Sequence, residues 1–137
     1  MAKRSKHVRR FLRAARERLA DARPLVPDRP LAAVYLAGYT VECALKALVL
    51  STYPEHEQKR VAAEEFRGTR GHDFVWLLRH HRVRGGAEPP AEVRAALAAV
   101  RDWGTDLRYT PSGRYDGDAD EFLAAAEAVR GWAERSV

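Results

Sequence analysis

The stretch from Leu31 to Leu50 constrains the fold most, because nearly every position in it is apolar. A helix that is apolar on all sides has to be covered on all sides, so we expect this segment to be the central, buried helix of a bundle. Glu42 and Lys46 interrupt the apolar run and leave no stretch of 18 uncharged apolar residues. A transmembrane span is therefore not expected.

Helical periodicity also dominates the rest of the chain. An apolar stripe at steps of three and four runs from Val8 to Ala22. Pro24, Pro27 and Pro30 then end this first helix and separate it from the central one. After the central helix, residues 51–71 are expected to be a polar connection that holds at most a short helix around 58–66. Further helices are expected from 73 to about 84, with Asp73 as the cap, from 89 to 103 and from about 120 onward, with a loop over 104–117. The chain is thus predicted to be all-α, a single domain over 1–137 formed by a bundle of four to five helices.

Composition excludes several classes of protein. One cysteine among 137 residues excludes a disulfide scaffold and a multi-cysteine zinc site. The adjacent His80 and His81 lack a third metal ligand at helical spacing, so neither a metal nor another cofactor is expected. The basic start is not followed by the uninterrupted apolar segment of a signal peptide. We therefore expect a cytoplasmic protein that does not enter the membrane.

Positive charge is concentrated at the start of the chain. Residues 1–24 carry nine Lys and Arg against two acidic residues, although the net charge of the whole chain is only +5. Arg9, Arg13 and Arg16 fall opposite the apolar stripe of the first helix. They form either a solvated face or a surface that binds RNA phosphates or an acidic protein partner.

Four polar side chains share one side of the central helix. Tyr35, Tyr39, Glu42 and Lys46 are spaced by four, three and four residues, which places them along one stripe. Glu42 and Lys46 are within ion-pair reach, and neither is readily buried without a partner. The pair is either purely structural or part of a polar pocket, in which Glu42 meets Arg108 or His72 and orients that basic group toward a ligand.

Two further groups of residues are candidates for binding. His72 precedes a predicted helix, where it would assist a phosphate bound at the helix N-terminus. The late loop contributes alternating basic and aromatic side chains: Arg108, Tyr109, Arg114 and Tyr115. The two tyrosine rings either pack within the loop or stack on a nucleic-acid base.

The chain resembles HEPN domains (higher eukaryotes and prokaryotes nucleotide-binding) in three segments: AAVYLAGYTVECALKALVL, GHDFVWLL and WGTDLRYTPSGRYDGDADEFLAAAEAV. The resemblance implies a compact helical bundle, commonly dimeric, found beside nucleotidyltransferases in toxin–antitoxin pairs and in RNA-targeting defence proteins. Active members cleave RNA without metal through an Arg followed four to six residues later by a His near the start of a late helix. In that chemistry the His moves protons and the Arg stabilises the charge that develops on the phosphate.

The late loop departs from this pattern. No His follows Arg108, and Arg114 stands where the His is expected. An Arg-x4-His spacing does occur at Arg67 and His72, but it precedes an earlier helix, and about two such matches are expected by chance. Position therefore favours Arg108 as the functional arginine over the Arg67–His72 match, although His72 is retained as a second catalytic candidate.

Two functions are consistent with these observations. The first is a protein of a bacterial toxin–antitoxin or defence module that handles RNA or a nucleotide, with a degenerate ribonuclease motif. The second is a non-catalytic dimeric module that docks on a nucleotidyltransferase or another protein partner. A homodimer is expected because the resemblance implies one. It is also expected because the apolar and Trp positions outnumber what four short helices can bury alone.

Overall fold

The computed structural model describes residues 3–137, and all regular structure in this range is helical. The α-helices are α1 (Lys6–Ala22), α2 (Pro30–Ser51), α3 (Glu55–Glu64), α4 (Phe74–Val83), α5 (Ala91–Val100) and α6 (Ala119–Ser136). Four 3-10 turns lie between them: η1 (Arg23–Leu25), η2 (Gly68–His72), η3 (Thr105–Tyr109) and η4 (Ser112–Arg114). The all-α prediction is confirmed. The described residues form six helices rather than four or five, because the polar connection after α2 forms a helix, α3, whose acidic first turn suits the helix dipole.

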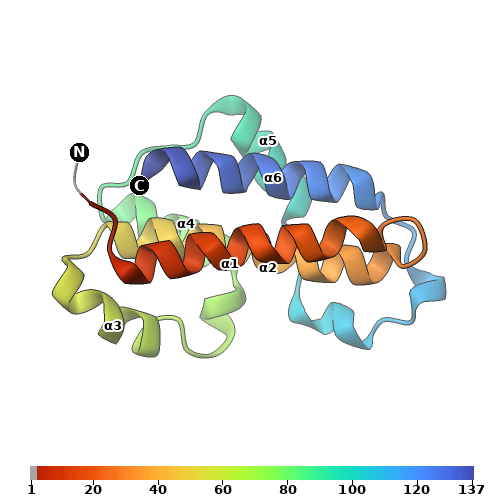
Figure 1. Cartoon of the computed structure of the whole chain (residues 1–137), viewed down its shortest axis with the longest axis horizontal. Helices are drawn as coiled ribbons and strands as arrows, with labels where there is room; N and C mark the ends of the chain where they lie inside the picture. Colours follow the sequence, from red (N-terminus) through yellow and green to blue (C-terminus); the bar gives the residue numbers. More distant parts are fainter. Residues whose placement is uncertain (1–2) are drawn as a thin grey trace.

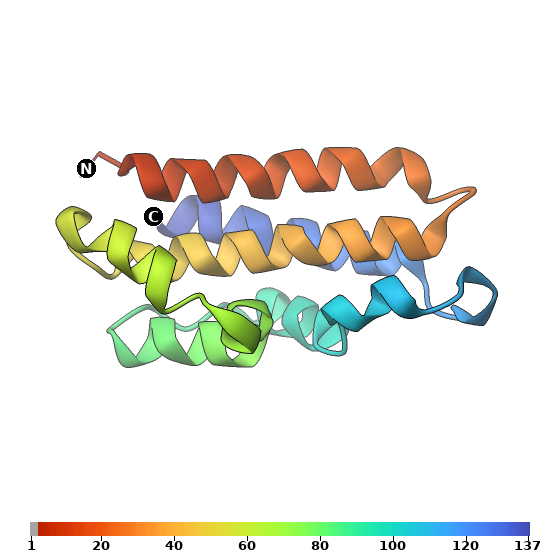
Figure 2. The same cartoon turned by 90° about the horizontal axis from the view of Figure 1, so that it is seen from below.

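Helix α2 lies at the centre of the bundle. It packs against α1, α4 and α6. Figure 1 shows α1, α2 and α6 running along the long axis of the molecule, and the two chain ends lie at the same end of the bundle. In Figure 2 α2 runs between α1 and α4. Every side chain of α2 from Ala44 to Leu50 is buried, so the prediction of a central buried helix is confirmed.

The apolar length of α2 is explained by this position. The helix is long and apolar enough to cross a membrane, but 78% of its most apolar 18-residue segment is buried inside the bundle. The neighbouring helices therefore cover the surface that lipid would cover in a membrane helix.

Side-chain caps fix the starts of three helices. Ser5, Asp73 and Asp118 each accept a hydrogen bond from a backbone N–H three residues later, at the starts of α1, α4 and α6 respectively. The cap at Asp73 lies between the end of η2, which carries His72, and the start of α4.

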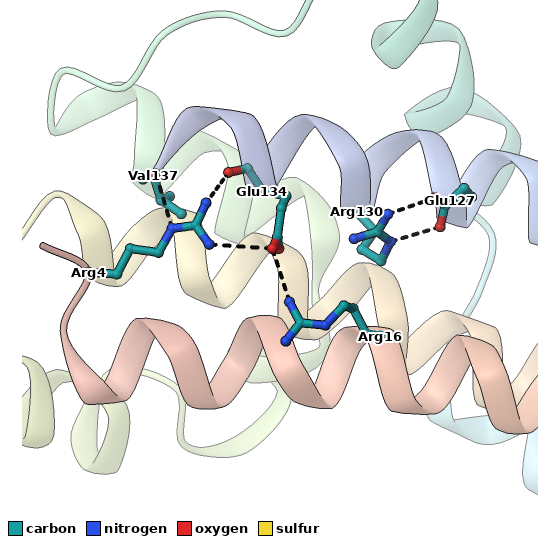
Figure 3. Close-up of polar contacts among 6 residues, drawn as sticks. All are labelled: Arg4, Arg16, Glu127, Arg130, Glu134 and Val137. Carbon is teal, nitrogen blue, oxygen red and sulfur yellow. Dashed lines mark hydrogen bonds and ion pairs between the residues drawn. The ribbon is translucent and has the colours of Figure 1, made fainter. Parts of the chain in front are cut away.

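Ion pairs join the first helix to the last one (Figure 3). Arg4 donates to the backbone carbonyls of Glu134 and Val137 and lies 3.4 Å from the Glu134 carboxylate. Arg16 reaches the same carboxylate at 3.0 Å. Both cations lie near the C-terminal end of α6, where the helix dipole favours positive charge.

Two tryptophans that suggested a dimer are buried within the single chain. Trp103 and Trp132 lie in the core, and the large apolar side chains exposed within residues 3–137 are Val75, Val83 and Tyr109. The argument for pairing from excess apolar residues was therefore wrong. Its physical error was to assume short helices, whereas the long helices α1, α2 and α6 bury these side chains themselves.

His81, for which the sequence suggested no role beyond an incomplete metal site, is buried near the end of α4. It is 4% exposed, its ring packs edge-on against Trp132, and its Nδ1 has no hydrogen-bond partner. Burial lowers the pKa of His81 below its ordinary value. The neutral ring therefore acts as an apolar core side chain.

This burial predicts acid sensitivity. The unfolded chain takes up a proton near pH 6.5 and the folded chain only below it, so stability is expected to fall as the pH decreases through this window. Urea unfolding at several pH values measures how steeply the free energy of unfolding depends on pH. One such histidine contributes up to about 1.4 kcal/mol per pH unit to this slope. His81→Phe is expected to flatten it. An unchanged slope in that variant would show that His81 is not responsible.

Candidate functional site

Glu42 is the acceptor of a buried cluster of charges on α2. The whole Glu42 residue is 4% exposed, and its Oε2 lies 2.9 Å from Nζ of Lys46 one turn later. Its Oε1 lies 2.6 Å from Nδ1 of His72. The Lys46 ammonium also lies 6.0 Å from the ring centroid of Phe11 and 5.4 Å from that of Phe66. The polar stripe predicted from the sequence is thus present, with both of its ions partnered.

His72 is the exposed member of this cluster. Its side chain is 44% exposed, whereas that of Glu42 is 6% exposed. A carboxylate only accepts, so Nδ1 carries the hydrogen of this contact and Nε2 remains available. A buried carboxylate that fixes the tautomer and orientation of a His is the arrangement used to prepare imidazoles for proton transfer or for anion binding.

Four aromatic rings continue this face of α2 toward its N-terminal end. The hydroxyls of Tyr35 and Tyr39 are 3.0 Å apart, and both rings contact Trp103. Trp103 also stacks on Phe74 of α4, with ring centroids 5.4 Å apart. Burial and the hydrogen bond to Tyr35 raise the pKa of Tyr39, so this phenol stays neutral.

Gly38 allows Trp103 to lie against α2. A Cβ at this position would be 1.8 Å from Cε2 of the indole ring. The Trp103 side chain, and not the backbone of a neighbouring helix, occupies the space beside Gly38. Trp103 was expected on the helix that begins near Pro89, whereas it lies beyond the end of α5.

Arg108 lies at the Tyr35 end of the same face. Its guanidinium is fully exposed and lies 4.9 Å from the ring centroid of Tyr109. Hydrogen bonding to Tyr109 and Tyr35 raises the pKa of Arg108. Of the two partners predicted for Glu42, the structure shows His72 and not Arg108, because Lys46 and His72 occupy both carboxylate oxygens.

His72 and Arg108 therefore mark the two ends of one surface. His72 contacts Glu42, and Arg108 lies beside Tyr35, seven residues earlier on α2. At 1.5 Å per residue, the positions of Tyr35 and Glu42 are about 10 Å apart along the α2 axis. Next to Arg108, a cavity of about 530 Å³ opens between the start of α2 and the late loop, lined by Arg29, Leu31, Tyr35, Leu107 and Arg108 among others.

The remaining candidates lie in other settings. Tyr109 is 75% exposed, whereas Tyr115 is half-buried and packs on the core. The side chain of Arg114 lies outside the part of the chain that the structure describes. On α1, Arg13 pairs with Glu17, Arg16 pairs with Glu134 and Arg9 donates to the carbonyl of Arg4.

The sequence did not predict the aromatic side chains that pack beneath the tyrosines of this site. Trp103 contacts both tyrosines and stacks on Phe74, and Leu107 lines the cavity beside Arg108. The one signal for this arrangement was Gly38, a glycine in the middle of an otherwise apolar helix.

The family-model comparison covers nearly all of this architecture, since the model described as "HEPN domain" matches residues 8–136. The chain belongs to the HEPN family. The resemblance seen in the sequence is thereby confirmed, and the helical bundle is the one expected of a HEPN domain. No curated protein and no solved structure matches the chain. Within this HEPN domain, the late segment carries Arg108 and the segment before α4 carries His72.

Proposed function

We propose that this HEPN domain binds RNA or a nucleotide on the α2 face between His72 and Arg108, as part of a cytoplasmic bacterial toxin–antitoxin or defence module. The observation that carries the proposal is the 2.6 Å contact between buried Glu42 and exposed His72. If the Glu42–Lys46 ion pair served only stability, Glu42 would not need His72 as a further partner, because Lys46 already balances the charge of the carboxylate. The contact instead holds an imidazole at the surface, on the same helix face whose other end carries Tyr35 and the exposed Arg108.

Each group on this face has a distinct role in the proposal. The Arg108 guanidinium binds a phosphate, for which its planar fork is suited. The exposed Tyr109 ring, already beside that guanidinium, stacks on a base. Nε2 of His72 forms a hydrogen bond with a phosphate oxygen or a ribose hydroxyl farther along the strand.

The separation of these groups supports a degenerate ribonuclease motif. The imidazole nitrogen of a catalytic His has to lie about 2.6–3.2 Å from the oxygen whose proton it moves, and the arginine has to contact the same phosphate. His72 and Arg108 of one chain lie at levels about 10 Å apart along α2. They are therefore placed to contact different groups of a strand, which is a binding arrangement.

Affinity for a labelled single-stranded RNA tests the proposal. Arg108→Ala is expected to weaken binding about tenfold or more, because it removes charge-assisted hydrogen bonds to phosphate. His72→Ala is expected to weaken it less, and the RNA is expected to remain intact in both cases. Arg101→Ala, which removes an exposed cation at the end of α5, is the control. Loss of binding or of activity in His72→Ala alone, with Arg108→Ala unaffected, would move the site to Arg67 and His72.

We also propose a homodimer, which rests on the HEPN family and not on exposed apolar surface. Light scattering at micromolar concentration is expected to give about twice the 15.4 kDa chain mass. A chain mass that stays at the monomer value would contradict this. In that case, all contacts of the α2 face with RNA have to be made by a single chain.

The alternative function is docking on a nucleotidyltransferase or another acidic protein partner through α1. One observation favours it: a groove of about 670 Å³ on α1 is lined by Arg9, Arg10 and Arg13 among others. Arg16 holds α6 through Glu134, so the test replaces Arg9 and Arg10 with glutamine instead. Docking predicts that these variants lose salt-dependent binding to the partner while RNA affinity is unchanged. A neighbouring gene that encodes a nucleotidyltransferase would support it.

A further inference from the structure

A second cluster of aromatic rings lies where the end of α2 meets α4. The His80 ring stacks on Tyr53, with centroids 5.9 Å apart, and its centroid is 4.9 Å from that of Trp76. Nε2 of His80 is also 2.7 Å from the Tyr53 hydroxyl. The three rings are half-buried and line a cavity of about 300 Å³ together with Arg79, Val83 and Arg84.

Arginines flank these rings without acidic partners. The guanidinium carbon of Arg84 lies 3.4 Å from the ring centroid of Tyr53, and hydrogen bonds to Thr52 hold it there. The guanidinium carbon of Arg70 lies 5.3 Å from the ring centroid of Trp76. Across residues 3–137, no carboxylate lies within ion-pair distance of Arg70, Arg79 or Arg84.

The rings and the cations favour one class of ligand. Burial lowers the pKa of His80, and the nearby Arg84 and Arg70 act in the same direction against Glu65, so the ring is neutral near pH 7. Neutral aromatic rings stack on bases, and unpaired arginines bind phosphates. An acidic peptide would use the cations but not the rings, and duplex RNA does not present its bases for stacking.

This cluster lies beyond the His72 end of the α2 face described above. Trp76 follows His72 by four residues, whereas Tyr53 follows Tyr35, at the Arg108 end of that face, by 18 residues, which corresponds to about 27 Å along a helix. Figure 1 shows α3 and α4 toward the end of the bundle that carries the two termini, away from the late loop that carries Arg108.

We propose that this cluster is a stacking site for single-stranded RNA, in which Trp76 stacks on one base, Tyr53 supports His80 and Arg84 beside it, and Arg79 and Arg84 bind the adjoining phosphates. The site goes beyond the α2 face and does not depend on it. Its cavity lies at the lower end of the range of about 300–1,000 Å³ found for small-ligand sites, so it accommodates a single nucleotide at a time.

Fluorescence anisotropy with a labelled short oligoadenylate tests this site in the full chain. Trp76→Leu is expected to weaken binding about 5- to 100-fold, the range for loss of one base stack. Arg79→Gln is expected to weaken binding and to lower the salt slope by about 0.7, the value for one phosphate contact. Its side chain is exposed and makes no ion pair, so this variant is expected to fold normally. Tyr53→Phe keeps the ring and is expected to bind like the original chain.

The control is Arg101→Gln, which removes the same charge from the end of α5 and is expected to change affinity little. Unchanged affinity in both Trp76→Leu and Arg79→Gln would overturn the proposal. So would duplex RNA that binds as tightly as the single strand. Displacement of the RNA by oligoglutamate, together with no effect of Trp76→Leu, would indicate a surface that binds acidic partners through charge alone.

Discussion

Replacing Glu42 with alanine is expected to lower the free energy of unfolding by about 3–5 kcal/mol. The carboxylate is buried and accepts hydrogen bonds from both Lys46 and His72. Its removal leaves the Lys46 ammonium buried beside Phe11 and Phe66 without an anion. Urea unfolding measures this loss, which is large because a buried charge without a partner is more costly than the absence of the pair.

Two variants separate this effect from the loss of any Glu–cation pair. Glu17 forms an i, i+4 pair with Arg13 on the exposed face of α1, and Glu17→Ala is expected to cost about 0.3–0.5 kcal/mol. Replacing Glu42 with leucine and Lys46 with methionine together is expected to recover most of the stability. Equal losses in Glu42→Ala and Glu17→Ala would contradict the role of burial.

Gly38→Ala is expected to destabilise the fold by about 3 kcal/mol, the upper part of the range for overpacked cores. The added methyl group would lie 1.8 Å from the indole of Trp103. The ring has little room to move away, because it stacks on Phe74 and contacts Tyr35 and Tyr39. Thermal unfolding measures the loss, and the tyrosine pair on the α2 face is expected to be displaced with Trp103.

Gly131 in α6 provides a matched control. A Cβ at this position would meet only the flexible end of Arg135, at 3.1 Å. Gly131→Ala is expected to leave stability unchanged or to raise it by up to about 1 kcal/mol through helix propensity. If both alanine variants unfold at the same temperature, Trp103 does not require the glycine.

The sequence predicted the parts of the site that depend on helical spacing. Steps of three and four placed Tyr35, Tyr39, Glu42 and Lys46 on one face, and the structure keeps them there. The nearly continuous apolar run over 31–50 also identified α2 as the central helix. These features depend on residues close together in sequence, so local geometry is sufficient to predict them.

Contacts between distant segments were not predictable in the same way. Position in the chain favoured Arg108 as the partner of Glu42, but η2 delivers His72 to that carboxylate, 30 residues away in sequence. Trp103 reaches Gly38 because the chain turns back after α5. Such contacts depend on how the connecting segments fold, and these segments carry no periodic pattern.

Photo-crosslinking tests the proposed RNA face most directly. The full chain is irradiated with single-stranded RNA that contains 4-thiouridine, and the crosslinked peptides are mapped by mass spectrometry. The account predicts crosslinks at Tyr109 beside Arg108 and at His72, with fewer at Tyr109 in the Arg108→Ala variant. Crosslinks confined to the α1 arginines, with none at Tyr109 or His72, would contradict it.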